Sequence, residues 1–212
     1  MELTWLGHAC FRLRSREATI VTDPYEAGSG YPTLKLTANI VTVSHADPRH
    51  SAAAAIGGSP RVIDRPGEYE IAGVPIIGVR TYRDREKGAT LGKNVSFVFT
   101  VEDMQIGHLG NLGHVPNAEQ AEALTGLDVL LIPVGGRVTL DAKLAAETIS
   151  LLQPRLVVPM HFATPREKED LDGIDRFLRE MGLAAAEPQP RLSVTKSSLP
   201  DSVQVVVLAP PS

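Results

Sequence analysis

The chain has 212 residues, of which 43% are hydrophobic and 22% charged, a balance typical of globular proteins. Its net charge of −4 and its lack of a basic run argue against nucleic-acid binding and against attachment to a membrane through basic residues. The single cysteine excludes an internal disulfide framework and a cysteine-rich zinc ribbon. No segment approaches the ~18 apolar residues of a membrane span and the N-terminus lacks a secretory pattern, so we expect one cytoplasmic domain over residues 1–212.

The first half of the chain predicts strands. Its short runs are rich in β-branched and aromatic residues, and turn-forming pairs such as Gly7-His8 and Asp23-Pro24 separate them. We expect strands at Leu3–Leu6, Cys10–Leu13, Ala18–Thr22, Ile40–Val43, Arg61–Ile63, Glu68–Ile71, Val74–Val79, Val95–Val101 and Gln105–His108.

Helices are predicted only in the second half. Asn117 and Asp141 are N-cap residues ahead of two helical patterns, the second over Ala142–Leu152. Thr164-Pro165 has the form of an N-cap followed by proline, which predicts the start of a third helix that ends at Gly182.

Three apolar runs predict strands between and after these helices: Asp128–Pro133, Leu156–Pro159 and Val203–Leu208. Many strands are thus followed by alternating helices and strands. This order favours an α/β protein with two sheets packed face to face and helices outside, rather than one doubly wound parallel sheet.

Candidate metal ligands follow the buried strand predicted at Ile40–Val43. His45, Asp47 and His50 can all bind a borderline cation such as zinc. Because they stand at the end of a buried strand, they have a rigid base from which to converge. Two histidines five residues apart on a loop are more often unrelated, so this motif needs support from other segments.

Two later segments repeat the arrangement. The strand ending at His108 runs into a turn with three glycines that ends at His114, and glycine permits backbone conformations that other residues resist. His161 follows the strand predicted at Leu156–Pro159. One such histidine is more often structural, but three strand ends that present histidines favour a shared site.

These motifs resemble the metallo-β-lactamase-fold superfamily, specifically its small bacterial zinc-dependent hydrolases. The resemblance covers nearly the whole chain and includes Trp5-Leu6-Gly7-His8-Ala9-Cys10-Phe11, Thr22-Asp23-Pro24, Val43-Ser44-His45, Pro66-Gly67-Glu68-Tyr69, the turn from His108 to His114, Ile132-Pro133-Val134-Gly135-Gly136 and Pro159-Met160-His161. It implies an αββα sandwich of two mixed β-sheets flanked by helices, with a dinuclear metal site on loops at one edge.

The resemblance also implies a substituted metal site. The superfamily's first ligand motif, His-x-His-x-Asp-His, falls on His45, Asp47, Arg49 and His50, so Asp47 replaces a histidine and Arg49 replaces the aspartate. The next ligand, usually a histidine, matches Arg83.

The bridging carboxylate of the family matches Asn111, and the last histidine is retained as His161. Four of the seven compared positions are therefore changed. A guanidinium group has no lone pair to donate and is always protonated. At 4 Å it would repel a divalent ion by about 8 kcal/mol at an effective dielectric constant near 20. We therefore expect Arg49 and Arg83 to replace the metals, with Asp47 as an ion-pair partner.

Such a site would be hydrolytically weak or inactive and would bind a small anionic molecule through Arg49 and Arg83. Two alternatives remain. If Arg49 points to solvent, His45, Asp47, His50 and His161 could hold one zinc or other divalent ion in a mononuclear hydrolase of an ester, lactone or phosphoester. The chain could also be a structural or interaction protein that retains the fold, with no metal at all.

Other polar residues have two interpretations each. His114 and Lys196 are candidates for substrate contact, although polar support of the fold is the commoner role. Asp23 is either a carboxylate that orients a ligand histidine or an ordinary turn residue. The sequence assigns no role to His8 or His108.

Overall fold

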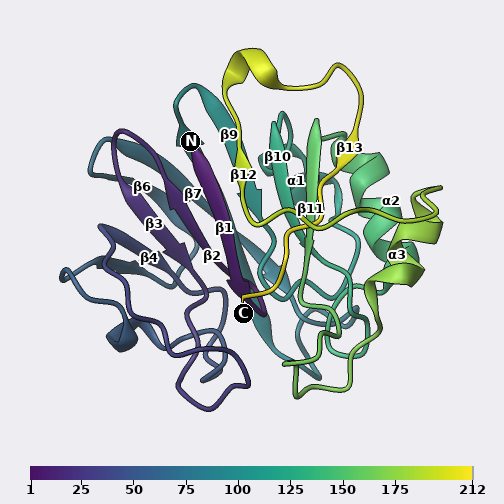
Figure 1. Ribbon diagram of the computed structural model, residues 1–212, viewed down its shortest axis with the longest axis horizontal. Helices are drawn as coiled ribbons and strands as arrows, with labels where there is room; N and C mark the ends of the chain where they lie inside the picture. The colour runs from purple at the N-terminus through teal and green to yellow at the C-terminus, as the bar shows by residue number, and fades with distance from the viewer. Residues whose placement is uncertain (212) are drawn as a thin grey trace.

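The computed structural model describes residues 1–211 and contains two mixed β-sheets packed face to face (Figure 1). The six-stranded sheet has the order β12-β1-β2-β3-β4-β5. Its strands are β1 (Glu2–Gly7), β2 (Cys10–Arg14), β3 (Thr19–Thr22), β4 (Ile40–Thr42), β5 (Arg61–Ile63) and β12 (Leu192–Ser193).

The seven-stranded sheet has the order β13-β11-β10-β9-β8-β7-β6. Its strands are β6 (Gly67–Ile71), β7 (Val74–Tyr82), β8 (Lys93–Val101), β9 (Met104–His108), β10 (Val129–Pro133), β11 (Leu156–Met160) and β13 (Gln204–Val205). The two sheets and their pairing confirm the predicted sandwich of mixed sheets.

One large apolar core lies between the sheets, and it includes Trp5 and Phe11 from the first sheet and Phe97 and Phe99 from the second. Every residue of β10 and β11 is buried, as expected for parallel strands covered on both faces. The helices α1 (Ala118–Ala123), α2 (Ala142–Leu152) and α3 (Ile174–Glu180) lie on the side of the seven-stranded sheet (Figure 1).

The outer face of the six-stranded sheet has a thinner cover than the expected helical layer. Its buried side chains, among them Val21 and Val41, pack against Tyr25, Tyr31 and Ile56. These partners lie in the loop after β3 and beside the short 3₁₀ helix η1 (Ala53–Ala55).

The strands that precede the histidine motifs all run in the same direction within their sheets. β1 and β3 are both antiparallel to β2, and β4 is parallel to β3. In the other sheet β9, β10 and β11 are parallel, and β7 shares their direction because β8 is antiparallel to both β7 and β9. Two backbone hydrogen bonds join the sheets at this edge, from His161 N to His8 O (3.1 Å) and from Val95 N to Ser44 O (2.8 Å). The loops after these strands therefore gather at one edge.

The prediction of a helix starting at Thr164-Pro165 was wrong. The Thr164 side chain accepts hydrogen bonds from the backbone N–H groups of Arg166 and Glu167, which closes a turn, and helix α3 begins only at Ile174. The predicted strand Val203–Leu208 is reduced to β13, and the short strand β12 was missed. The two predicted N-caps are confirmed, because Asn117 and Asp141 each accept a backbone hydrogen bond from the first turn of their helix.

Candidate functional site

Six loops at the carboxyl ends of strands carry the candidate site. They supply His8 after β1, Asp23 after β3, the segment from His45 to His50 after β4, Arg83 after β7, Asn111 after β9 and His161 after β11.

Three of these residues have a left-handed backbone. The φ angles of His8, Asp23 and His161 are 47°, 40° and 50°. Side chains other than glycine adopt this region at a cost, and such residues cluster at functional sites. In each case the sharp change of direction follows directly on a strand and turns the side chain toward the shared edge.

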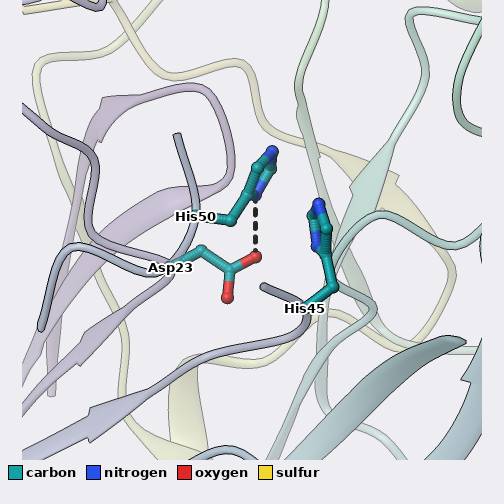
Figure 2. A group of neighbouring side chains, drawn as sticks. All are labelled: Asp23, His45 and His50. Atoms are coloured by element: carbon teal, nitrogen blue, oxygen red, sulfur yellow. Dashed lines mark hydrogen bonds and ion pairs between the residues drawn. The ribbon is translucent and has the colours of Figure 1, made fainter. Parts of the chain in front are cut away.

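The buried Asp23 carboxylate organises the histidines of the β4 loop (Figure 2). It accepts hydrogen bonds from Ser44 N (2.7 Å) and Ser44 Oγ (2.5 Å), and one oxygen lies 3.0 Å from Nδ1 of His50. Burial raises the pKa of Asp23, but the hydrogen bond to His50 and the neighbouring histidines bring it below its usual value. An ionised carboxylate only accepts, so Nδ1 of His50 carries a proton and Nε2 is left with a lone pair.

The same reasoning applies to His45. Ser44 Oγ donates its one hydrogen to Asp23, so it accepts from Nδ1 of His45 at 3.0 Å. Nε2 of His45 then holds a lone pair, and this buried atom has no hydrogen-bond partner within residues 1–211. Burial lowers the pKa of His45 to about 3, so the ring is neutral.

Asp23, His45 and His50 form a group that could hold a metal ion. Each offers a ligand atom, and these atoms lie within 4.8 Å of one another. The ring centroids of the two histidines are 4.4 Å apart, and Figure 2 shows their outer nitrogens on the side away from the carboxylate. Burial also lowers the pKa of His50, which keeps its ring neutral.

Arg49 occupies the region next to this group. Its Nε and Nη2 donate to the two carboxylate oxygens of Asp47 at 3.1 and 3.2 Å, and its Nη1 contacts Oε1 of Glu169. The hydrogen bonds from Arg49 hold the pKa of Asp47 well below its usual range. The carboxylate of Asp47 is therefore committed to a guanidinium group, as the sequence hypothesis expected.

His161 is bonded to the same glutamate. Its Nε2 lies 2.8 Å from Oε2 of Glu169. Burial raises the pKa of Glu169, but the hydrogen bond to His161 and the charges of His161 and Arg49 bring it down to about 2. The ionised carboxylate can only accept a hydrogen bond, so Nε2 of His161 carries the proton and has no free lone pair.

Two carboxylates of the site were missed by the sequence reasoning. Glu167 lies 2.9 Å from Nδ1 of the buried His8, and Glu169 bridges Arg49 and His161. Both were hidden because they lie in the segment predicted as a helix, and neither His8 nor Arg49 is close to them in the sequence. With Asp23 and Asp47 they outnumber the two arginines, so the surroundings are more acidic than the motif positions indicate.

Arg83 and Asn111 also pair. In the amide orientation that its neighbours favour, the Asn111 oxygen accepts from Nε and Nη2 of Arg83, both at 3.2 Å, while the amide nitrogen donates to Thr139 Oγ1 at 3.2 Å. Nη1 of Arg83 donates to the carbonyl of Leu91 at 3.1 Å. A guanidinium group thus lies against the residue that matches the bridging carboxylate.

Comparison with known proteins defines the family of this site. Residues 2–161 match the family model described as a beta-lactamase superfamily domain. The chain belongs to the metallo-β-lactamase superfamily. It is 40% identical to a Thermotoga maritima protein assigned as a Zn-dependent hydrolase of that superfamily, whose crystal structure superposes with a TM-score of 0.82 over 98% of this chain and 97% of the other.

Curated relatives are described as UPF0173 metal-dependent hydrolases. One from Methanoculleus marisnigri is 30% identical and the alignment covers 84% of this chain and 88% of that protein. Another from Methanopyrus kandleri is 26% identical over 86% of this chain and 94% of that protein. An isothiocyanate hydrolase from Delia radicum gut bacteria is 16% identical with a TM-score of 0.70, which shows a shared fold.

The residues of this superfamily member fit one divalent cation better than two. His45 and His50 present two neutral imidazole lone pairs, and Asp23 lies on the other side of the rings, where it fixes their tautomers. The neighbouring Arg49, Arg83 and Asn111 supply two positive charges and one neutral amide, which do not offset the charge of a second ion. Of the four predicted metal ligands, His45 and His50 belong to this group, while Asp47 and His161 are hydrogen-bonded to Arg49 and Glu169, so the four-residue ligand set stays a prediction.

Two further histidines have structural partners. Nε2 of His114 accepts the Tyr82 backbone N–H at 3.2 Å, and its Nδ1 lies 2.8 Å from the carbonyl of Val115. Nε2 of the buried His108 lies 2.8 Å from the carbonyl of Ala9. Both contacts favour support of the backbone, and the predicted contact of His114 with a substrate stays a prediction.

Lys196 lies at the far end of the sheet from the site. Its Nζ is 2.7 Å from Oδ2 of Asp128, which directly precedes β10. The site loops follow the opposite, carboxyl ends of the strands, so Lys196 does not line this edge.

Among residues 1–211 no helix combines the length and apolar character that a membrane crossing requires.

Proposed function

We propose that this protein binds a small anionic molecule at a metallo-β-lactamase-type site in which an ion-pair network replaces the two-metal centre. The observation that carries the proposal is the pairing of the Arg49 guanidinium with both Asp47 and Glu169 next to the histidine group. Hydrolysis by a two-metal mechanism is then weak or lost.

The electrostatic reason is direct. Arg49 and Arg83 bring fixed positive charges to positions next to a divalent ion, and neither has a lone pair to donate. Asn111 contributes no charge to offset two cations. Such a site disfavours a second metal ion, and an anion is favoured on its Arg83 side, where the cationic side chains of the adjoining cavity outnumber the acidic one.

A cavity of about 620 Å³ beside the site supports anion binding. His45 and Arg83 lie in its wall, with further cationic side chains from Arg65, Arg80 and Lys93 and one acidic side chain from Asp64. Guanidinium groups bind carboxylates and phosphates through paired hydrogen bonds. Because Arg49 already has two carboxylate partners, Arg83 is the arginine that we expect to contact a ligand in this cavity.

A mononuclear metal-dependent hydrolase is the second candidate, and the free Nε2 of His45 favours it. His45 and His50 would hold the ion, and Asp23 would keep both rings in the required tautomer. A divalent cation held there would supply Lewis-acid polarisation of a carbonyl or phosphoryl oxygen. The cationic cavity would then orient an anionic ester, lactone or phosphoester.

Two measurements separate the candidates. Metal analysis of protein purified without chelator gives the zinc content, with His45→Ala as the variant that removes a ligand. Calorimetry with inorganic phosphate and with acetate compares the parent with Arg83→Met and with Arg85→Met, a matched control in a neighbouring cavity.

The anion-binding proposal predicts well under one metal ion per chain and anion binding that Arg83→Met abolishes and Arg85→Met retains. One zinc ion that is lost in His45→Ala, together with zinc-dependent hydrolysis of generic esters or phosphodiesters, would favour the mononuclear hydrolase. Two tightly bound metal ions would contradict both candidates. Binding of neither metal nor anion would leave a structural or interaction protein.

A further inference from the structure

We infer that Arg49 and His161 form a carboxylate-binding subsite, that the chain's own Glu169 fills it as an internal ligand, and that a carboxylate-bearing small molecule binds there by displacing Glu169. The inference rests on the proposed anion-binding function and deepens it, because it names the chemical class of the ligand and the group with which that ligand competes.

The contacts of Glu169 show how the subsite holds a carboxylate. One oxygen contacts Nη1 of Arg49 and the other lies 2.8 Å from Nε2 of His161. The two donors come from different loops, after β4 and after β11, and converge on one planar group. Nε and Nη2 of Arg49 already belong to Asp47, so Nη1 is the donor left for a second anion.

The negative charge of Glu169 is not needed to balance the positive charge of Arg49. Asp47 by itself neutralises Arg49, and Glu167 has its own partner in His8. An external carboxylate in place of Glu169 would restore the same two contacts and the same charge. The exchange would therefore leave the rest of the network intact.

The segment that carries Glu169 has few apolar contacts with the rest of the protein. Residues 164–172 contain no helix or strand, and Leu171 is their one buried apolar side chain. Polar contacts hold the rest, such as Thr164 Oγ1 to the Tyr31 hydroxyl (2.8 Å) and Lys168 Nζ to the carbonyl of Gly28 (2.6 Å). Segments with few buried apolar contacts open at low free-energy cost.

The Arg49 side of the subsite reaches solvent, whereas the His161 side chain is fully buried. The side chains of Arg49 and Glu169 are 40% and 14% exposed. A small molecule can therefore approach the subsite without crossing the apolar core.

Chemical rescue tests the inference in full-length, chelator-treated protein. Acetate is titrated at constant ionic strength against the parent, Glu169→Ala, the double variant Glu169→Ala/Arg49→Met and the control Asp170→Ala, and the melting temperature is followed. Asp170 lies on the same segment but is exposed, with Arg137 as its partner. We expect acetate to raise the melting temperature of Glu169→Ala with an apparent affinity about 10- to 100-fold above that of the parent, because the internal competitor is gone. Asp170→Ala should behave as the parent, and the double variant should lose the effect.

A second measurement covers the case in which Glu169→Ala folds poorly. Glu169→Gln keeps the size of the side chain and removes its charge, and its His161 ring resonances should shift at acetate concentrations about 10- to 100-fold lower than those needed in the parent. Equal acetate responses in Glu169→Ala and Asp170→Ala, or an unshifted His161 ring in Glu169→Gln, would overturn the inference. If acetate still raises the melting temperature when Arg83→Met is combined with Glu169→Ala, the subsite acts separately from the cavity. The result for the subsite can therefore be interpreted even if phosphate and acetate do not bind the parent through Arg83.

Discussion

Oδ2 of Asp23 lies 3.0 Å from Nδ1 of His50 and joins the ends of the adjacent parallel strands β3 and β4. A carboxylate behind an imidazole fixes the tautomer of the ring and raises its basicity. In this protein the group that orients the histidines is complete, because Asp23, Ser44, His45 and His50 are joined by hydrogen bonds. The site has therefore kept two preset lone pairs, on Nε2 of His45 and Nε2 of His50, beside a pair of arginines.

Asp23→Asn should destabilise the fold. The amide keeps the shape of the side chain, but its NH₂ group would face donors on Ser44 and His50, and the charge-assisted hydrogen bonds to the carboxylate would be lost. We expect a loss of about 3 kcal/mol in the free energy of unfolding, measured by urea denaturation. The exposed Asp64→Asn should change it by less than about 0.5 kcal/mol. A cost for Asp23→Asn as small as that of the control would show that the carboxylate does not organise this loop.

Stability should decrease on mild acidification. Burial lowers the pKa of His45 to about 3 and also lowers the pKa values of His50 and His108 from 6.5, so the native state keeps these rings neutral. The unfolded chain takes up protons below pH 6.5, and stability present above that value is lost as the pH falls toward the native pKa values.

Each fully shifted histidine contributes a slope of about 1.4 kcal/mol per pH unit below its unfolded pKa. The slope is measured by urea denaturation of chelator-treated protein at several pH values between neutrality and the onset of carboxylate titration. Replacement of His45 with Gln should remove one histidine's share of the slope. A stability that is flat across this window would contradict the buried, neutral state of all three rings.

Restoring the family ligands should create a two-metal site. The variant Asp47→His/Arg49→Asp/Arg83→His/Asn111→Asp replaces two positive charges with donors and returns the bridging carboxylate. We expect about two zinc ions per chain by metal analysis, against at most one in the parent. Asp47→His/Asn111→Asp, which leaves both arginines in place, should not reach two. If the fourfold variant folds and still binds no more zinc than the parent, the arginines are not what excludes the second ion.

Lys196→Ala should leave ligand and metal binding unchanged. The ammonium group is paired with Asp128 at the amino end of β10, and its side chain is 53% exposed. We expect a loss of about 0.2–1 kcal/mol in stability and the same anion affinity as the parent by calorimetry. A clear loss of affinity would show that the ligand reaches the opposite end of the sheet.

Much of the architecture follows from local pattern. Short runs of β-branched, aromatic and other apolar residues predicted most strands, and Asn117 and Asp141 predicted two helix starts, because these patterns depend on residues a few positions apart. The same is true of part of the site. His45 and His50 lie in the loop after a strand, His161 directly follows another, and the pairing of Asp47 with Arg49 spans two residues.

The partners of these residues depend on the tertiary structure. Asp23 and His50 are 27 residues apart, and His8 and Glu167 come from opposite ends of the chain. Even Glu169, eight residues from His161, reaches it only because Thr164 closes a turn where the local pattern predicts a helix. Residue type shows which charges are present, but only the packing of loops at a shared sheet edge decides which charges meet and which lone pairs stay free.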